Sequence, residues 1–343
     1  MKWLKRIGLG VAALLIFVLL AGTTYEQWSR WSAARAFPPP GELIDVDGRQ
    51  AHLSCTGEGS PTVILEAGVD PFGALTWTAV QPDIASLTRV CSYDRAGIMW
   101  SEPGAEPRDA HRVADELNAL LEASAESPPY VMVGHSLGGL FQRVYDSRHP
   151  DEVAGFVFVD SSHPEQMERL PKEVIEIMKA SLPPPFLMKA MSRLGVIRMM
   201  GEMSGDYLPE EWQAAAARVG PRSVAGLIGE MVALETIATQ ARVTGSLGSR
   251  PVVVLSAGIQ DPPPGIEISD ATRREMASTW FELQEELAAL STNSERRLVE
   301  NSAHYIQLQA PEAVIAAVRD VVAAVREGTP LGFQDDRRQV ERR

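Results

Sequence analysis

Residues 130–140 combine a serine with the local structure that nucleophilic catalysis needs. A short apolar run leads into Gly134-His135-Ser136-Leu137-Gly138, and a helical pattern follows. In such a strand–turn–helix element the tight turn lifts the serine hydroxyl clear of the sheet, and the flanking glycines avoid the collisions that a Cβ would cause. The backbone N–H of Leu137, at the start of the helix, points to the space in front of Ser136. The motif predicts an attacking hydroxyl; the simpler interpretation is a Gly-rich strand–helix connection.

The composition favours a globular protein and argues against some partners. The chain has 343 residues, of which 45% are hydrophobic, so a sizeable core is available. A formal net charge of −13, with no basic stripe, argues against a nucleic-acid partner. The two cysteines, Cys55 and Cys91, are not in a metal-ligand spacing. No metal or organic cofactor is implied.

The first 25 residues predict a membrane segment. Residues 7–25 carry no charge and follow three basic residues, a pattern that places the N-terminus on the cytoplasmic side. A cleaved signal peptide, an uncleaved anchor and a buried helix of the domain are the alternatives. We favour the anchor, because no clean Ala-X-Ala cleavage site is present and Tyr25, Trp28 and Trp31 follow at interfacial distance. Either membrane alternative exports the domain, to the periplasm or the extracellular space.

Irregular segments flank the expected domain. Residues 26–40 end in three prolines and are expected to form a stiff linker. Residues 327–343 are polar and charged, which predicts a disordered tail. Residues 41–162 and 249–326 are then expected to form one core.

Strands and helices alternate along that core. Near-continuous apolar strands between helices are typical of a parallel sheet covered on both faces, and ligands of such sheets bind at the carboxyl ends of the strands. A hairpin around Asp47-Gly48 opens the pattern. The fold class is therefore α/β, with an eight-stranded, mostly parallel sheet. The expected strands are residues 43–46, 50–55, 62–66, 88–93, 130–133, 153–159, 251–256 and 297–300, and the expected helices are residues 77–87, 111–122, 270–290 and 311–326.

Residues 163–248 interrupt this alternation. They predict several short helices broken by prolines and glycines, and they contain eight of the twelve methionines. An inserted helical cap over the strand ends fits this pattern. Methionine suits a surface that adapts to apolar ligands, although it also fills irregular cores.

These pieces together resemble the α/β-hydrolase superfamily, on its serine esterase, lipase and aminopeptidase side. The resemblance covers about residues 41–326. Two departures are Ala67-Gly68, where many relatives have His-Gly, and Met99, where relatives often have Gly. The motifs that support it are Leu65-Glu66-Ala67-Gly68, Tyr93-Asp94-Arg95-Ala96-Gly97, Gly134-His135-Ser136-Leu137-Gly138-Gly139, Val159-Asp160-Ser161-Ser162-His163-Pro164 and Ala303-His304-Tyr305.

The resemblance implies a Ser-Asp-His triad around Ser136. The family's base follows the last strand, where this chain has His304; His163, just past an earlier strand end, is the rival. Two carboxylates fit the chain order of serine, acid and histidine. Asp261 follows the seventh strand, the commoner site in the superfamily. Asp160 ends the sixth strand, and we favour it because the branch that this chain most resembles has Val-Asp there.

The oxyanion donors and the cysteines complete the expectations. A tetrahedral oxyanion needs two preorganised donors, for which we expect the N–H groups of Leu137 and Val69, with that of Asp70 as the alternative to Val69. Cys55 and Cys91 lie in strands that this fold makes neighbours. We favour two buried free thiols, with a disulfide possible if the domain is exported.

The resemblance implies hydrolysis of a small-molecule ester, with an apolar acyl group, through an acyl-enzyme. A serine at the elbow speaks against thiol hydrolases and against carboxylate nucleophiles. Amide hydrolysis of the aminopeptidase type is an alternative that needs a carboxylate in the cap. A non-catalytic ligand-binding protein and an acyltransferase are the others, and the oligomeric state is open. The cap carboxylates considered are Glu173, Glu176, Glu202 and Glu230.

Overall fold

The computed structural model describes residues 2–181, 183–201, 205–260 and 267–332. Asp261 and most of the expected tail, residues 333–343, lie outside the described residues.

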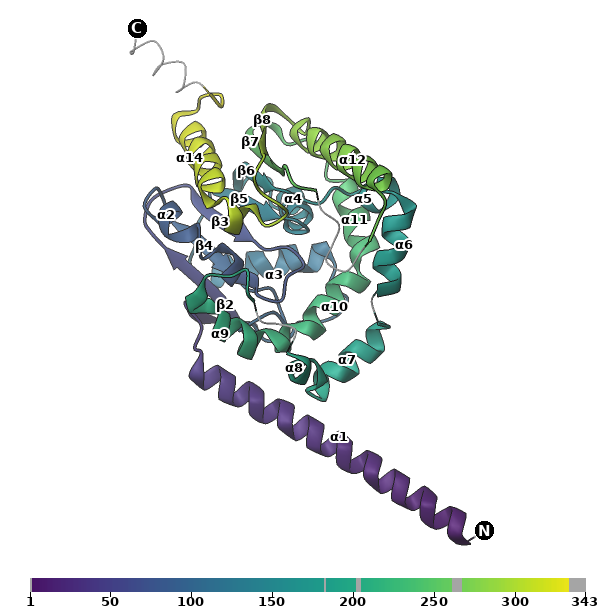
Figure 1. Cartoon of the computed structure of the whole chain (residues 1–343). Coiled ribbons are helices and arrows are strands. Elements are labelled where there is room, and N and C mark those ends of the chain that lie inside the picture. Colours follow the sequence, from purple (N-terminus) through teal and green to yellow (C-terminus); the bar gives the residue numbers. More distant parts are fainter. Residues whose placement is uncertain (1, 182, 202–204, 261–266, 333–343) are drawn as a thin grey trace.

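One sheet of eight strands organises the molecule (Figure 1). The strand order is β1-β2-β4-β3-β5-β6-β7-β8. β2 is antiparallel to both of its neighbours, β1 and β4, and the strands from β4 to β8 in this order are parallel to one another. This confirms the α/β fold class and the mostly parallel sheet. The strands are β1 (Glu42–Val46), β2 (Arg49–Thr56), β3 (Thr62–Glu66), β4 (Val90–Tyr93), β5 (Tyr130–His135), β6 (Val153–Val159), β7 (Gly248–Ala257) and β8 (Ser291–Val299).

Helices cover both faces of this sheet. Alternate residues of a strand point to opposite faces, so Met132 packs with α3 (Ala110–Ala123) and α4 (Gly138–Arg148), whereas Val131 packs with α2 (Gln81–Ala85) and α14 (Pro311–Glu327). A short helix α13 (Ile306–Gln309) precedes α14, and α12 (Asp270–Ala288) precedes β8. The strands are apolar on both faces for this reason.

Two predicted elements were wrong in extent. The expected helix over residues 77–87 is a 3₁₀ turn η1 (Gly73–Trp77) followed by the short α2. The last strand was expected at residues 297–300, but β8 runs from Ser291 to Val299. β8 pairs only with β7, so it lies at the sheet edge. Its first half is polar and partly exposed, and such a strand lacks an apolar pattern.

Short helices fill the chain between β6 and β7 and lie along one side of the core (Figure 1). Ile237 and Ala241 of α11, the last of them, pack in the core cluster with α3 and α4. The helices in the segment expected to form an inserted cap, residues 163–248, are called the cap helices below. These elements are α5 (Gln166–Arg169), α6 (Lys172–Ser181), α7 (Pro185–Arg193), α8 (Val196–Met200), α9 (Glu210–Val219), η2 (Gly220–Ser223), α10 (Val224–Val232) and α11 (Leu234–Arg242).

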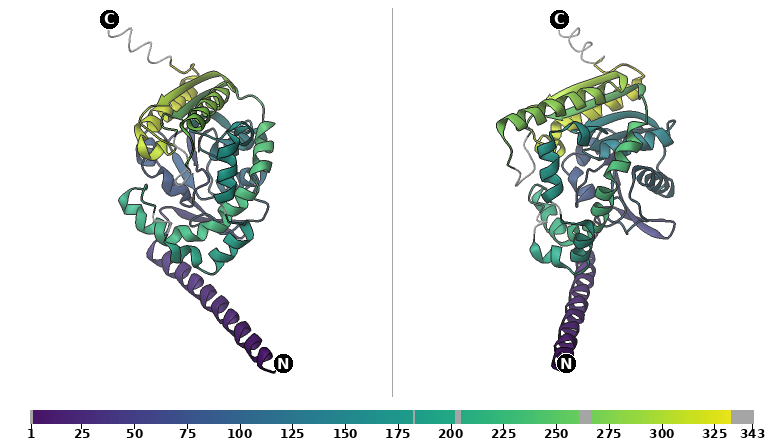
Figure 2. Two further views of the ribbon diagram at one scale, coloured as in Figure 1. Left: turned by 45° about the vertical axis from the view of Figure 1, so that its right-hand side comes forward. Right: turned by 90° about the vertical axis from the view of Figure 1, so that its right-hand side faces the viewer.

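The N-terminal helix α1 (Lys2–Ala36) projects from the domain (Figures 1 and 2). Its apolar part is long enough to cross a membrane, and none of that part is buried in the protein. The expected linker over residues 26–40 is helical as far as Ala36. Glu26 and Ala33 of this part are buried, because α1 packs there against the cap helices.

A disulfide joins Cys55 of β2 to Cys91 of β4. The expectation of two free thiols was wrong. The two residues face each other in the antiparallel register of these strands, which places their side chains side by side.

Candidate active site

The structure places Ser136 in a strained turn between β5 and α4. Its φ is +51°, which is unusual for a residue with a side chain. A Cβ at Gly134 would lie 2.8 Å from the Gln142 side chain, and one at Gly138 would lie 2.5 Å from the carbonyl oxygen of Glu66. The Ser136 carbonyl accepts hydrogen bonds from Gly139 and Ser162 at 3.1 and 2.8 Å. Both glycines are therefore required for the turn, which presents the half-buried Ser136 at the carboxyl end of β5.

His304 and Asp160 form a hydrogen-bonded pair at the carboxyl ends of the strands, where the Ser136 turn also lies. His304 Nδ1 lies 2.7 Å from Asp160 Oδ2. The other carboxylate oxygen accepts from the Ala257 N–H at 3.0 Å and from Trp280 Nε1 at 2.8 Å. A carboxylate held this way accepts the Nδ1 proton, which leaves His304 Nε2 as the basic nitrogen. The His304 side chain is 43% exposed, whereas that of Asp160 is 2% exposed.

Strand geometry fixes Asp160. It follows β6, has a φ of +40°, and donates its N–H to the Leu255 carbonyl of β7 at 2.8 Å. Trp280 reaches it from α12. Sequence reasoning missed Trp280, because nothing in a lone tryptophan of a helix signals a carboxylate partner. Asp261, the other expected acid, lies outside the described residues.

His135 connects the turn to the histidine loop. Its Nε2 lies 2.9 Å from the His304 carbonyl oxygen, and the two rings have centroids 4.6 Å apart. Burial lowers the pKa of His135 well below its ordinary value, and His304 lowers it further. The neutral ring therefore donates Nε2–H to that carbonyl. This contact holds the backbone of His304 next to the Ser136 turn.

The other candidates have local partners. His163 Nδ1 accepts from the Glu165 N–H at 3.2 Å, and its Nε2 lies 3.5 Å from Glu286. These three side chains place possible metal-ligand atoms within 4.8 Å of one another, at partly exposed positions. Asp94 pairs with His52 at 2.7 Å.

The loop after β3 passes over Ser136. A Cβ at Gly68 would lie 2.8 Å from Ser136 Cβ. Arg95 donates to the carbonyls of Ala67 at 2.6 Å and Gly68 at 2.7 Å. Since the C=O and N–H of a trans peptide point in opposite directions, the N–H of Val69 is directed away from Arg95. The N–H of Leu137, directly before α4, belongs to the free amide groups at a helix start.

Arg95 itself is held by two buried carboxylates. It forms a bidentate pair with Glu230 of α10 at 2.7 and 2.8 Å and contacts Glu66 at 2.6 Å. The Tyr93 hydroxyl donates to the other oxygen of Glu66. Burial raises the pKa of Glu66, and the Arg95 charge opposes that rise. This network ties the cap to the loop over Ser136. The sequence showed Arg95 in a strand-end motif, but not its partner 135 positions away.

The buried side chain of Asp70 accepts hydrogen bonds at both oxygens. Its Oδ2 accepts from the hydroxyls of Tyr207 and Tyr305, both at 2.8 Å, and its Oδ1 from the Phe72 N–H at 2.7 Å. Burial raises the pKa of Asp70, and these hydrogen bonds oppose the rise. Tyr305 follows His304, and Tyr207 belongs to the cap. The Asp70 side chain thus joins three segments around the site.

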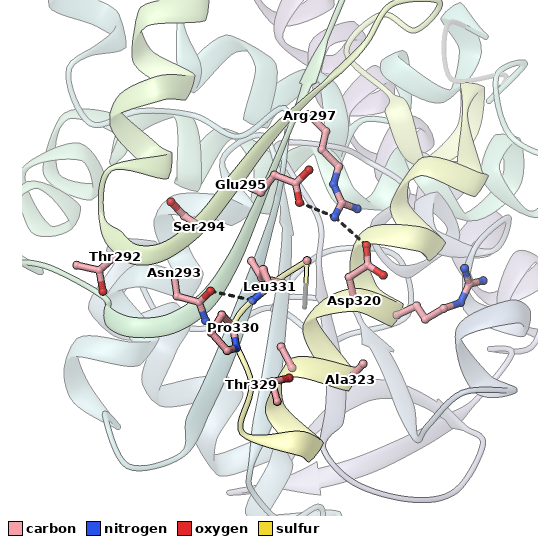
Figure 3. A pocket seen from close by; sticks show the side chains of 13 residues that line it. Thr292, Asn293, Ser294, Glu295, Arg297, Asp320, Ala323, Thr329, Pro330 and Leu331 are labelled. Atoms are coloured by element: carbon pink, nitrogen blue, oxygen red, sulfur yellow. Dashed lines mark hydrogen bonds and ion pairs between the residues drawn. The ribbon is translucent and has the colours of Figure 1, made fainter. Parts of the chain in front are cut away.

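A cavity of about 730 Å³ lies away from this site, between β8 and α14 (Figure 3). There Arg297 bridges Glu295 at 2.8 Å and Asp320 at 2.7 Å. Its lining contains none of the candidate catalytic residues. This cavity is therefore not the candidate active site, which lies at the carboxyl ends of the strands around Ser136, His304 and Asp160.

Comparison with known proteins identifies the family. The model described as alpha/beta hydrolase family matches residues 59–317, and the chain belongs to this family. The uncharacterized protein YqjL of Bacillus subtilis is 25% identical over 288 residues, which cover 83% of this chain and 94% of that protein. An uncharacterized protein of Schizosaccharomyces pombe is 35% identical over 155 residues, which cover 37% of this chain and 29% of that protein.

Other comparisons are partial or concern the fold. This chain spans 29%, 51% and 20% of the length of three curated relatives that it matches. The solved structure of the epoxide hydrolase CorEH is similar with a TM-score of 0.57 and 19% identity, over 83% of this chain and 98% of that one. At that identity the likeness shows the fold alone. The reaction has to be inferred from the site.

Proposed function

We propose that this protein is a membrane-anchored serine hydrolase that cleaves carboxylic esters through an acyl-enzyme. Ser136 Oγ attacks the ester carbonyl carbon while His304 Nε2 takes the hydroxyl proton. Asp160 holds the imidazolium, and the N–H groups of Leu137 and Val69 receive the oxyanion. His304 then protonates the departing alcohol. A water that gives its proton to His304 then attacks the acyl carbon. The bond to Ser136 Oγ breaks, His304 returns the proton to that oxygen, and the acid is released.

The observation that carries this proposal is the His304–Asp160 pair at 2.7 Å beside the strained Ser136 turn. A carboxylate that fixes Nδ1–H leaves Nε2 free to act as a base. The two further hydrogen bonds to Asp160 keep the carboxylate in one orientation. A serine in that turn, rather than an aspartate, supports an acyl-enzyme.

The partners and positions of the cap carboxylates favour ester substrates over peptides with a free amino terminus. Both oxygens of Glu230 are engaged by Arg95, so it is not free to bind a substrate amine. Glu173 accepts from Thr272 at 2.8 Å on the surface, and Glu176 is exposed. Glu202 lies outside the described residues. The eight methionines of residues 163–248 support an apolar acyl group, because methionine adapts to apolar ligands.

Two observations support anchoring by α1: the length of this helix and the disulfide between Cys55 and Cys91. Its 35 residues form a helix of about 52 Å, and a bilayer core needs about 30 Å. The Cys55–Cys91 disulfide fits an oxidising compartment, as expected for an exported domain.

The test of the nucleophile is labelling with a fluorophosphonate. The wild type should be labelled, and Ser136→Ala should not. Ser147→Ala is the matched control, because Ser147 lies near the C-terminal end of α4 and its hydroxyl donates a hydrogen bond to the Val144 carbonyl. Absence of labelling in well-folded wild-type protein would overturn the proposal and favour a binding protein.

The acid is tested by a pair of isosteric variants. Asp160→Asn cannot hold the required tautomer of His304, so kcat for a chromogenic ester should fall on the order of 10⁴-fold. Asp261→Asn should change kcat less than about threefold. The reverse ranking would assign the acid to Asp261.

A further inference from the structure

We propose that α7 and α8 of the cap rest on the membrane surface and insert their exposed apolar side chains into the bilayer that α1 spans. This inference rests on the anchoring part of the proposed function and not on the reaction.

The two helices present apolar side chains to solvent. Phe186 and Leu187 of α7 are 77% and 43% exposed, and Met199 and Met200 of α8 are 63% and 49% exposed. α7 and α8 contact each other, and exposed apolar side chains gathered on neighbouring helices mark an interaction site in soluble domains.

The turn between α7 and α8 sits directly on α1. A Cβ at Gly22 of α1 would lie 2.9 Å from the Leu194 carbonyl oxygen, and one at Gly195 would lie 2.7 Å from the Tyr25 ring. Glycine at both positions permits this close approach. The end of the domain from which α1 projects is therefore formed by these cap helices (Figure 2).

The contact lies at the level where α1 leaves the hydrocarbon. Residues 7–25 carry no charge, and a helix needs about 20 such residues to span a bilayer. Gly22 and Tyr25 are thus at the water interface on the side of the domain. α7 ends and α8 begins at that level, and both helices lie at the end of the domain from which α1 projects (Figure 2), so we place their exposed apolar side chains at the same interface.

A buried ion pair fixes the angle between α1 and the cap. Glu26 is 1% exposed, and it binds Arg198 of α8 at 2.9 Å and Arg30 at 2.7 Å. Removing one partner of such a pair is strongly destabilising, because a buried charge is left uncompensated. The domain is therefore held against the membrane in one orientation rather than tethered loosely.

The test is the depth of spin labels in the full chain, reconstituted in phosphatidylcholine nanodiscs. Single labels are placed by Phe186→Cys and Met199→Cys; the native cysteines are paired and do not react. Val243→Cys is the matched control, because Val243 is 78% exposed but directly follows α11, which packs on the core. Labels at 186 and 199 should collide more with oxygen than with an aqueous nickel reagent, and the label at 243 should show the reverse.

The possible outcomes separate the proposals. Aqueous behaviour at all three positions, with intact mass and α1 still in the bilayer, would overturn docking. Dipolar broadening between labels of two chains would assign the surface to a second copy and also overturn it. A shortened chain that leaves the nanodisc would refute the anchor. Since collision rates do not depend on hydrolysis, a failure of fluorophosphonate labelling leaves the docking result intact.

Discussion

Arg95 determines the backbone of the candidate site at the scale of single residues. One guanidinium holds two carbonyls of the loop over Ser136 and two carboxylates, Glu66 and Glu230. Only a planar fork with five donors makes all these contacts at once. The hydrogen bonds of Arg95 go to Glu66, Glu230 and the carbonyls of Ala67 and Gly68, and not to Ser136 or His304, so we regard it as a positioning residue for the Val69 N–H.

Arg95→Lys should lower kcat for an ester by about 10²-fold or more while KM changes little. A lysine cannot keep the Gly68 peptide oriented, and loss of one oxyanion donor costs about 2.7–4 kcal/mol. Steady-state kinetics measure the effect. Arg108→Lys is the control, since buried Arg108 also forms a bidentate pair with a carboxylate, that of Glu116. Equal losses of kcat in the two variants would contradict the positioning role.

At the scale of elements, the site depends on how closely the loop after β3 approaches the turn after β5. Gly68 is the point of contact, with Ser136 Cβ and His135 Nδ1 at 2.8 and 3.2 Å from an added Cβ. None of these atoms belongs to a flexible side-chain end. The loop must therefore move if Gly68 gains a side chain.

Gly68→Ala should abolish most of the ester hydrolysis and leave the melting temperature within a few degrees of the wild type. Gly155→Ala offers the opposite case, because its Cβ would lie 2.6 Å from Val321 Cγ1 inside the sheet–helix packing. Overpacking there should cost about 1–3 kcal/mol of stability and spare the kcat of the folded fraction. Kinetics and thermal unfolding of both variants measure this. If Gly68→Ala unfolds the protein instead, the loop has a structural role.

At the scale of the whole molecule, one disulfide crosslinks the sheet. Cys55 and Cys91 are 36 positions apart, which gives about 4 kcal/mol of stabilisation in the chain-entropy model. A reductant should therefore lower the melting temperature of the wild type by roughly 10 °C. The double variant Cys55→Ala, Cys91→Ala should melt near the reduced wild type and ignore the reductant. A wild type that is insensitive to complete reduction would contradict this prediction.

Local patterns in the sequence determined much of the molecule. Apolar strands between helices, each bounded by turn residues, are properties of neighbouring residues, so the eight-stranded sheet and the position of the Ser136 turn could be predicted. The full length of β8 could not be predicted, because an edge strand needs no apolar face. The full length of α1 could not be predicted either, because its last turns are stabilised by contacts with the cap helices. His304 and Asp160 could be named as candidates from their places after strands together with the resemblance to the α/β-hydrolase superfamily.

Only the tertiary structure decided which distant groups meet. Arg95 with Glu230, Asp70 with Tyr207 and Tyr305, and Trp280 with Asp160 each join segments far apart in the chain. Such pairs leave no local pattern, because they depend on the register of the sheet and on the packing of the cap. The disulfide follows the same rule. The sequence supplied two cysteines, and the antiparallel register of β2 and β4 made them partners.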